Sequence, residues 1–117
     1  MPNNTTLNQN LVNPYYSEIS FIRRLAANGE LIVSDHAHQR ISQRGISLLS
    51  LFDAVENGTL LEIQNLERDL KFVFQDCKNP PCFFVVVAPK QNNKCLVITT
   101  YEPDSRWELV SGNWRRK

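Results

Sequence analysis

In the first half of the chain, apolar residues recur every three to four positions, which is the period of an amphipathic helix. This pattern predicts a first helix between Asn13-Pro14, which suits a helix start, and Asn28-Gly29, which suits a helix end. The short apolar segment Leu31-Ile32-Val33 follows and predicts a first strand. The chain therefore opens with a helix and a short strand.

Two further helices are predicted, each preceded by a capping side chain and closed by a glycine. The second is HAHQRISQR, with Ser34 or Asp35 as its cap and Gly45 after it. The third is LLSLFDAVEN, capped by Ser47 and closed by Gly58. All of the predicted helices thus lie in the first half of the chain.

From Thr59 onward the apolar residues alternate with polar ones, which predicts β-strands. Two alternating segments are joined by the charged turn LERD. The next, CFFVVVA, is apolar throughout and should lie centrally, covered on both faces. The turn at 89–93 then leads into KCLVITTYE. Short links between consecutive strands favour an antiparallel meander. We therefore predict an α+β fold, with N-terminal helices packed on a four- to five-stranded antiparallel sheet.

Length and composition fit one domain. The chain has 117 residues, of which 42% are hydrophobic, and its first 13 are rich in Asn and Thr. We expect residues 1–13 to form a flexible arm and residues 14–117 to form a single α+β domain.

The charge balance excludes a protein that coats nucleic acid through a strongly cationic surface. Lys and Arg total 13 against 12 Asp and Glu, and three of the cations are the final residues, Arg115, Arg116 and Lys117. Any anionic ligand must therefore be held by a focused patch and not by the field of the whole protein.

The cysteines and the apolar runs point to a cytoplasmic protein. The chain has three cysteines, Cys77, Cys82 and Cys95, its N-terminus lacks the pattern of a secretory signal, and no apolar run reaches the length of a membrane span. Cys77 and Cys82 have a spacing that would suit half of a zinc site. Cys82 and Cys95 lie in strand-like segments, however, which favours ordinary buried cysteines. We expect no metal, no cofactor and no membrane partner.

The second helix carries a stripe of basic side chains. His36, Arg40 and Arg44 are spaced four residues apart, so they lie on one helix face, where like charges cost about 0.2–0.5 kcal/mol per pair. Such a stripe suits a phosphate, because arginine offers a planar fork to two of its oxygens. In a purely structural alternative, His36 caps or packs and the arginines pair with acidic side chains. The acidic candidates are Asp35, Asp53 and Glu56.

Two later segments carry further candidates. Thr99 and Tyr101 lie two residues apart in a predicted strand, so their hydroxyls would share a face and orient a phosphate or a ribose, although both residue types are also common strand formers. The C-terminal segment combines tryptophans with basic residues, which would stack on bases or bind a backbone, or would form a merely solvated tail. The nucleic-acid-binding candidates in it are Arg106, Trp107, Arg115, Arg116 and Lys117.

Several of these motifs together resemble a known family. The string His36-x3-Arg40-x3-Arg44-Gly45-Ile46-Ser47, followed by an apolar helix ending at Asn57-Gly58, is similar to a bacterial family called domain of unknown function 4258. Later segments also resemble that family, and the similarity covers about residues 30–110. These segments are Lys71-Phe72-Val73, Pro81-Cys82-Phe83 and Ile98-Thr99-Thr100-Tyr101-Glu102-Pro103-Asp104, with Trp107 behind.

The resemblance implies a fold and a function. The family is similar to the RelE-like branch of the barnase, colicin and RelE ribonucleases, which are small toxins. It implies a metal-independent endoribonuclease in which the ribose 2′-hydroxyl attacks the adjacent phosphate. His36 would be the general base or acid, Arg40 and Arg44 would stabilise the phosphorane, and Thr99 and Tyr101 would position the substrate. The implied partners are RNA and an antitoxin protein, and DNA is not expected. The alternative is a non-catalytic module of the same fold that binds protein or nucleic acid.

Overall fold

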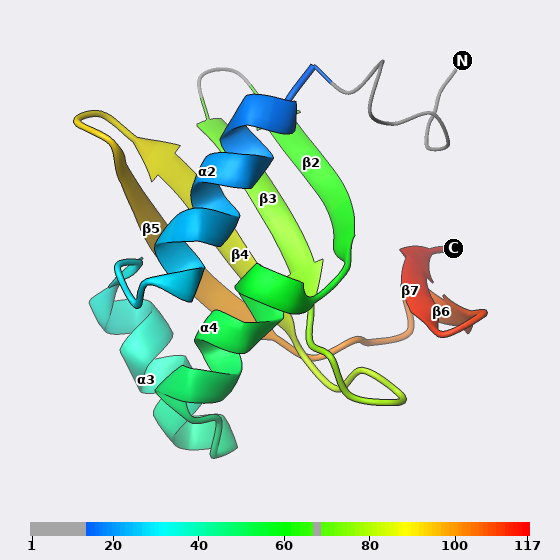
Figure 1. Cartoon of the computed structure of the whole chain (residues 1–117). Helices are drawn as coiled ribbons and strands as arrows, with labels where there is room; N and C mark the ends of the chain where they lie inside the picture. The colour runs from blue at the N-terminus through cyan, green and yellow to red at the C-terminus, as the bar shows by residue number, and fades with distance from the viewer. Residues whose placement is uncertain (1–13, 67–68) are drawn as a thin grey trace.

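The structure is a computed structural model that describes residues 14–66 and 69–117. The predicted arm at residues 1–13 and the middle of the LERD turn lie outside the described residues. Within them the helices are α2 (Tyr16–Ala27), α3 (Asp35–Arg44) and α4 (Leu48–Asn57). The strands are β1 (Ile32–Val33), β2 (Leu60–Leu66), β3 (Asp69–Gln75), β4 (Phe84–Lys90), β5 (Lys94–Tyr101), β6 (Trp107–Val110) and β7 (Asn113–Arg116). The α+β class is confirmed (Figure 1).

The main sheet has five strands in the order β1-β5-β4-β3-β2. Strands β2 to β5 form the predicted antiparallel meander, and β4 lies at its centre with five consecutive buried residues. The prediction of an antiparallel sheet is wrong at one edge. There β1 pairs parallel to β5, through Ile32 with Leu96 and Val33 with Val97. The sheet is therefore mixed. A parallel pair requires a long connection, and the two helices and three strands between β1 and β5 supply it.

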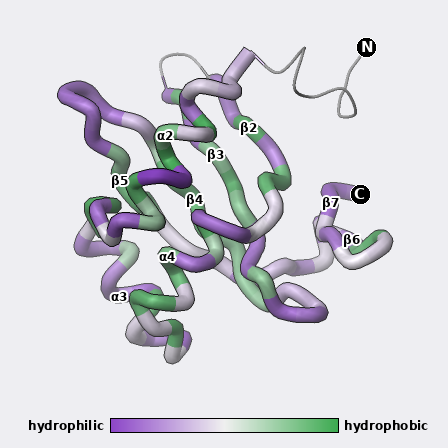
Figure 2. Tube along the Cα trace, in the orientation of Figure 1, coloured by the Kyte–Doolittle hydropathy of each residue, from purple (hydrophilic) through white to green (hydrophobic). Residues whose placement is uncertain are grey.

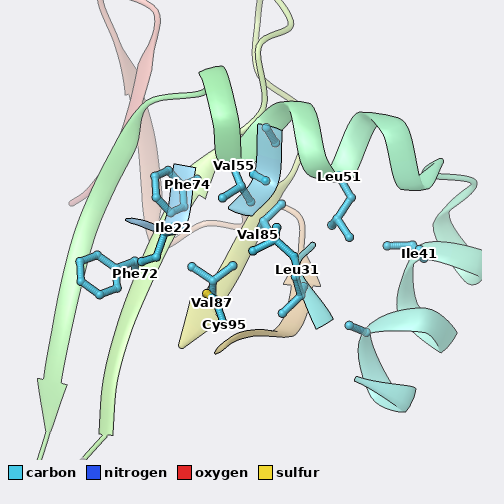
Figure 3. Close-up of a cluster of buried hydrophobic side chains, with 14 of the residues drawn as sticks. Ile22, Leu31, Ile41, Leu51, Val55, Phe72, Phe74, Val85, Val87 and Cys95 are labelled. Carbon is cyan, nitrogen blue, oxygen red and sulfur yellow. The ribbon is translucent and has the colours of Figure 1, made fainter. Parts of the chain in front are cut away.

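The helices cover one face of this sheet. Figure 1 shows α2 and α4 lying over the sheet, and Figure 3 shows the apolar cluster between the two layers. The cluster is formed by residues such as Ile22, Leu51, Val55, Phe74 and Val85, all fully buried. In Figure 2 the apolar residues follow the central strands, whereas the turn between β4 and β5 is polar. Burial of this cluster holds the two layers together.

The predicted helix ends at α3 and α4 are confirmed. The Ser34 hydroxyl accepts a hydrogen bond from the Ala37 amide at 3.0 Å, and Gly45 closes α3 in the left-handed conformation (φ 67°). The Ser47 hydroxyl caps α4 in the same way. The start of α2 was predicted too early, since the helix begins at Tyr16, and its N-cap residue, Tyr15, makes no side-chain capping bond.

The C-terminal segment is a β-hairpin that packs on the second face of the sheet, not a solvated tail. β6 and β7 are joined by Ser111 and Gly112, both at positive φ, as a tight hairpin turn requires. The side-chain amide of Gln75 fixes the hairpin, since it donates to Asn113 Oδ1 at 2.8 Å and accepts from the Trp114 amide at 3.0 Å. The Trp114 indole donates to the Pro81 carbonyl at 2.8 Å. These bonds hold the hairpin against the sheet, where Arg116 of β7 reaches Glu62 of β2.

Candidate functional site

The basic stripe of α3 is present, and its two ends lie in different surroundings. His36 is exposed in the first turn, where its Nε2 accepts a long hydrogen bond of 3.5 Å from Arg40 Nε. Arg44, at the last residue of the helix, donates through Nη1 to the Thr100 carbonyl at 2.8 Å. Within residues 14–66 and 69–117, neither arginine forms an ion pair with the acidic candidates of α3 and α4.

Thr99 and Tyr101 lie on the sheet face that points away from the helices. They pair with Val86 and Phe84, which belong to the apolar cluster of that second face. Val97 belongs to the helix-side cluster. If the strand alternated strictly, the side chains of Thr99 and Tyr101 would lie on the helix side with it. A register shift between Val86 and Val87 leaves Ile98 as an extra residue in β5 and reverses the faces after it. The stripe of α3 therefore does not face Thr99.

One end of the stripe nevertheless meets Tyr101. Among the described residues, β1 pairs with Leu96 and Val97 and no strand covers that edge of β5 beyond them, so Arg44 reaches the Thr100 carbonyl there. Arg44 and Tyr101 line one open hollow of about 490 Å³, which we call the arginine hollow. Its lining residues are Arg44, Tyr101, Glu102, Pro103, Asp104, Arg106 and Arg116. His36, Arg40 and Thr99 are not among them.

Two of the three guanidinium groups in the arginine hollow are held by carboxylates. Arg106 binds both carboxylate oxygens of Asp104, with a shortest contact of 2.7 Å, and lowers the pKa of that carboxyl to about 2. Arg116 binds Glu62 at 2.9 Å and lies 4.4 Å from the centre of the Trp107 ring. Both pairs lie near the surface, where water and salt weaken them, so an entering phosphate would compete with the carboxylates for both arginines.

Arg44 is the cation of the hollow that has no ionic partner among the described residues. Its hydrogen bond to a neutral carbonyl uses one of five N–H donors. Within residues 14–66 and 69–117 no other side-chain hydrogen bond of Arg44 is found, so the remaining donors can form the two parallel bonds by which arginine binds a phosphate. Arg44 is thus the strongest candidate for an anion-binding side chain.

Tyr101 is half-buried, and its ring packs edge-on against Phe84 with 5.2 Å between the ring centres. Burial raises the pKa of its phenol, and the nearby Glu62 carboxylate adds to the shift, while Arg116 and Arg106 oppose it. The phenol therefore keeps its proton at neutral pH. In chemistry at the hollow it suits the role of a proton donor more than that of a base.

The raised pKa gives a spectroscopic prediction. In an absorbance titration of the tyrosines at alkaline pH, we expect a component above about pH 10 that the Tyr101→Phe variant lacks. The folded state holds the Tyr101 proton more tightly than the unfolded chain does. The stabilisation that arises from this difference is fully present below the ordinary tyrosine pKa. It is lost as the pH rises through the folded value. If the late component persisted in Tyr101→Phe, the environment described for this phenol would be wrong.

The nucleic-acid-binding candidates of the C-terminal segment lie in different surroundings. Arg106 and Arg116 line the arginine hollow, whereas Arg115 pairs with Glu108 at 3.2 Å and Lys117 is exposed beyond β7. Trp107 is only 3% exposed beneath Arg116, so its ring cannot stack on a base as the sequence suggested. Its role is to support the arginine above it.

The sequence offered Glu102 as a possible acid–base partner for His36 and gave Asp104 only as part of the family-like motif. Glu102 follows Tyr101 directly, Asp104 comes two residues later, and both line the hollow. Asp104 carries a local signal, because an Asp-Ser-Arg sequence lets the carboxylate accept the Arg106 backbone amide, at 2.9 Å, as well as the guanidinium.

The cysteines do not gather. Cys95 is buried in the core, while Cys77 and Cys82 are exposed. Cys82 precedes β4, so the prediction that it lies buried in a strand was wrong. No three His, Cys, Asp or Glu side chains in the described part of the chain are grouped so as to hold a metal ion. Among the described helices, none is long and apolar enough to cross a membrane.

Comparison with known proteins gives one match. A family model described as "Domain of unknown function (DUF4258)" matches residues 33–102. Neither the curated proteins nor the solved structures contain a match to the chain. The matched region includes Arg44 and Tyr101, whereas α2, Arg106 and Arg116 lie outside it.

Proposed function

The chain belongs to the DUF4258 family, and from that membership and the site we propose that it is a metal-independent endoribonuclease of the RelE-like toxin type. The observation that carries the proposal is the convergence of three arginines and a protonated tyrosine in one open hollow. Phosphodiester cleavage needs groups that bind the phosphate and a group that protonates the leaving oxygen. The arginine hollow offers both.

In the proposed reaction, the ribose 2′-oxygen bonds to phosphorus and the bond from phosphorus to the 5′-oxygen breaks. The products are a 2′,3′-cyclic phosphate and a free 5′-hydroxyl. Arg44 binds the non-bridging oxygens, and it binds the more highly charged phosphorane more tightly than the ground state. Tyr101 gives its proton to the departing 5′-oxygen.

The proton of the 2′-hydroxyl needs an acceptor, and two residues are candidates for it. His36 is the base that the family resemblance implies, but it stands eight residues before Arg44, about 12 Å along the helix axis. Glu102 lines the arginine hollow itself. In the proposal Glu102 accepts the proton, whereas His36 and Arg40 bind RNA beyond the cleaved bond.

A second function is favoured by one specific observation. His36 and Arg40 contact each other on an exposed surface outside the hollow. A module that only binds RNA would need no base near Arg44, and the same arginines would hold the phosphates. In either case the partner is RNA, and for a toxin an antitoxin protein would be a second partner that blocks the hollow.

The proposal is tested by RNA cleavage in EDTA as a function of pH. We expect cleavage by the wild type, with a rate that rises with pH as the base loses its proton. This rise should lie at more acidic pH for a carboxylate base than for an imidazole base. Glu102→Gln is expected to reduce the rate about 100-fold, and His36→Ala to weaken RNA binding with little change in the maximal rate.

His38→Ala is the matched control, because His38 is exposed on the same helix and should change neither quantity. A large loss of maximal rate in His36→Ala alone would return the base role to His36. RNA binding without cleavage by the wild type would establish the binding module, and the absence of both would overturn the proposal.

A further inference from the structure

A second pocket adjoins the arginine hollow on the other side of Arg44. It has a volume of about 130 Å³, and we call it the Lys78 pocket. The side chains that matter in it are Arg44, Ser50, Lys78, Cys82 and Glu102. Arg44 and Glu102 line both the pocket and the hollow, so the two cavities are adjacent.

The chemistry of the Lys78 pocket suits the backbone of a nucleic acid. Lys78 and Arg44 are cations, and the Ser50 hydroxyl can donate to an anion. Phe83, the aromatic residue of the lining, is only 3% exposed and cannot act as a stacking platform for a base. The volume holds several water molecules, which is room for a phosphate group.

Glu102 limits where the anion can lie. Glu102 borders both cavities, and its carboxylate would repel a phosphate placed directly against it. A ribose hydroxyl, which donates a hydrogen bond, is the group that it suits. With a ribose at Glu102, one phosphate would lie in the arginine hollow and the next in the Lys78 pocket. Each phosphate would then face cations, and the Glu102 carboxylate would face a hydroxyl donor.

The segment that carries Lys78 is firmly anchored. The buried Asp76 carboxylate accepts hydrogen bonds from the backbone amides of Lys78 and Cys82, both at 2.8 Å, and of Phe83 at 3.0 Å. Lys78 therefore projects from a fixed backbone, although its own side chain is exposed. Such a lysine acts on an anion as a point charge.

We propose that the Lys78 pocket is a subsite for the phosphate that neighbours the one in the arginine hollow. The inference rests on the proposed function, because it assumes that RNA occupies the hollow. It adds that the protein grips two consecutive phosphates of a single strand, one on each side of Glu102. Recognition at this subsite is independent of base identity.

The test compares the binding of 2′-O-methyl RNA di- and trinucleotides, which carry one and two phosphodiesters. Both lack the attacking hydroxyl and its hydrogen bond to Glu102, so the comparison isolates the second phosphate. We expect the wild type to bind the trinucleotide about tenfold more tightly. Lys78→Gln should bind both with similar affinity, leave dinucleotide binding unchanged, and lower the salt dependence of trinucleotide binding by about 0.7 in log–log slope. Lys90→Gln, at the opposite end of β4, is the control and should behave as the wild type.

Cys82 provides an independent readout within the wild-type chain. Its thiol is exposed and lines the Lys78 pocket, so the trinucleotide should slow its alkylation. Cys77 serves as the internal reference. Cys77 is exposed but does not line the Lys78 pocket. Its Sγ lies 3.7 Å from the Asp53 carbonyl, and partial burial of the thiol raises its pKa to about 11. Its slow reaction should not change.

Two outcomes overturn the inference and are distinguishable. If the wild type binds the dinucleotide and Lys78→Gln keeps the tenfold preference for the trinucleotide, the second phosphate lies elsewhere and the proposed function stands. If the wild type binds neither oligonucleotide, the proposed function fails and the subsite fails with it.

Discussion

Replacing Arg44 with alanine is expected to slow RNA cleavage by about 100- to 1,000-fold, the usual cost of removing a donor to the developing negative charge. Arg44 is the guanidinium of the hollow that no described carboxylate neutralises, and it adjoins Tyr101. Its interactions strengthen as the phosphorane gains charge, so the loss should fall mainly on the maximal rate. Single-turnover measurements with saturating protein isolate that rate from binding.

The fold should survive this substitution. Arg44 contributes one hydrogen bond to the Thr100 carbonyl at the free edge of β5, and its removal is expected to cost about 1 kcal/mol of unfolding free energy. Gln43→Ala, at the exposed preceding residue, is the matched control and should retain full activity. Arg44→Lys should recover only part of the rate, because an ammonium group lacks the planar fork. Full activity in Arg44→Ala would exclude the proposed phosphate site.

Asp76→Ala is expected to lower the free energy of unfolding by about 3–4 kcal/mol, a large share of the stability of a small domain. The carboxylate is 5% exposed and accepts three backbone amides. Alanine leaves these donors without partners in the segment between β3 and β4. Urea unfolding of the full chain gives the change directly, provided that the slope with denaturant is unchanged.

Two further variants define this effect. Asp76→Asn keeps the shape but presents an N–H₂ group to one side of the cluster, so an intermediate loss is expected. Asp69→Ala, at an exposed aspartate at the start of β3, should change stability by less than about 0.5 kcal/mol. A similarly small change in Asp76→Ala would show that the carboxylate does not anchor the segment. Where Asp76→Asn folds, it should also lose part of the trinucleotide preference, because the same segment carries Lys78.

Local signals in the sequence predicted most of the elements. Ser34, Gly45 and Ser47 mark helix ends through hydrogen bonds and backbone conformations within a few residues, so they can be read without knowledge of the fold. The uniformly apolar segment CFFVVVA predicted the central position of β4. The parallel pairing of β1 with β5 joins segments more than 60 residues apart in the chain, and no local pattern encodes its direction.

The candidate site was predicted in part, for a physical reason that lies in β5. Residue spacing correctly placed Thr99 and Tyr101 on one face of the strand, but the extra residue at Ile98 turns that face away from the helices. A bulge depends on the register with the neighbouring strand, which periodicity in one strand does not contain. Helical spacing likewise grouped His36 with Arg44, yet only the C-terminal end of α3 meets the arginine hollow.

The C-terminal hairpin adds residues to the site from outside the region that matches the family. Arg44, Tyr101 and Glu102 lie within residues 33–102, whereas Arg106 and Arg116 follow it. Arg106, just before the hairpin, and Arg116 in β7 thus add two guanidinium groups to the hollow, and Gln75 connects the hairpin turn to the sheet. In a chain of nearly balanced charge, the arginine hollow thus gathers three guanidinium groups beside the carboxylates of Glu102 and Asp104, and Arg44 is the one that lacks a carboxylate partner among the described residues.

The most direct test of the account is the chemistry of the RNA ends that the wild-type chain produces in EDTA. We expect 2′,3′-cyclic phosphate and 5′-hydroxyl ends, formed at a rate that Arg44→Ala lowers at least 100-fold. Products with these ends formed at the same rate by Arg44→Ala, or no products from RNA that the wild type binds, would contradict the central claim that the arginine hollow cleaves RNA.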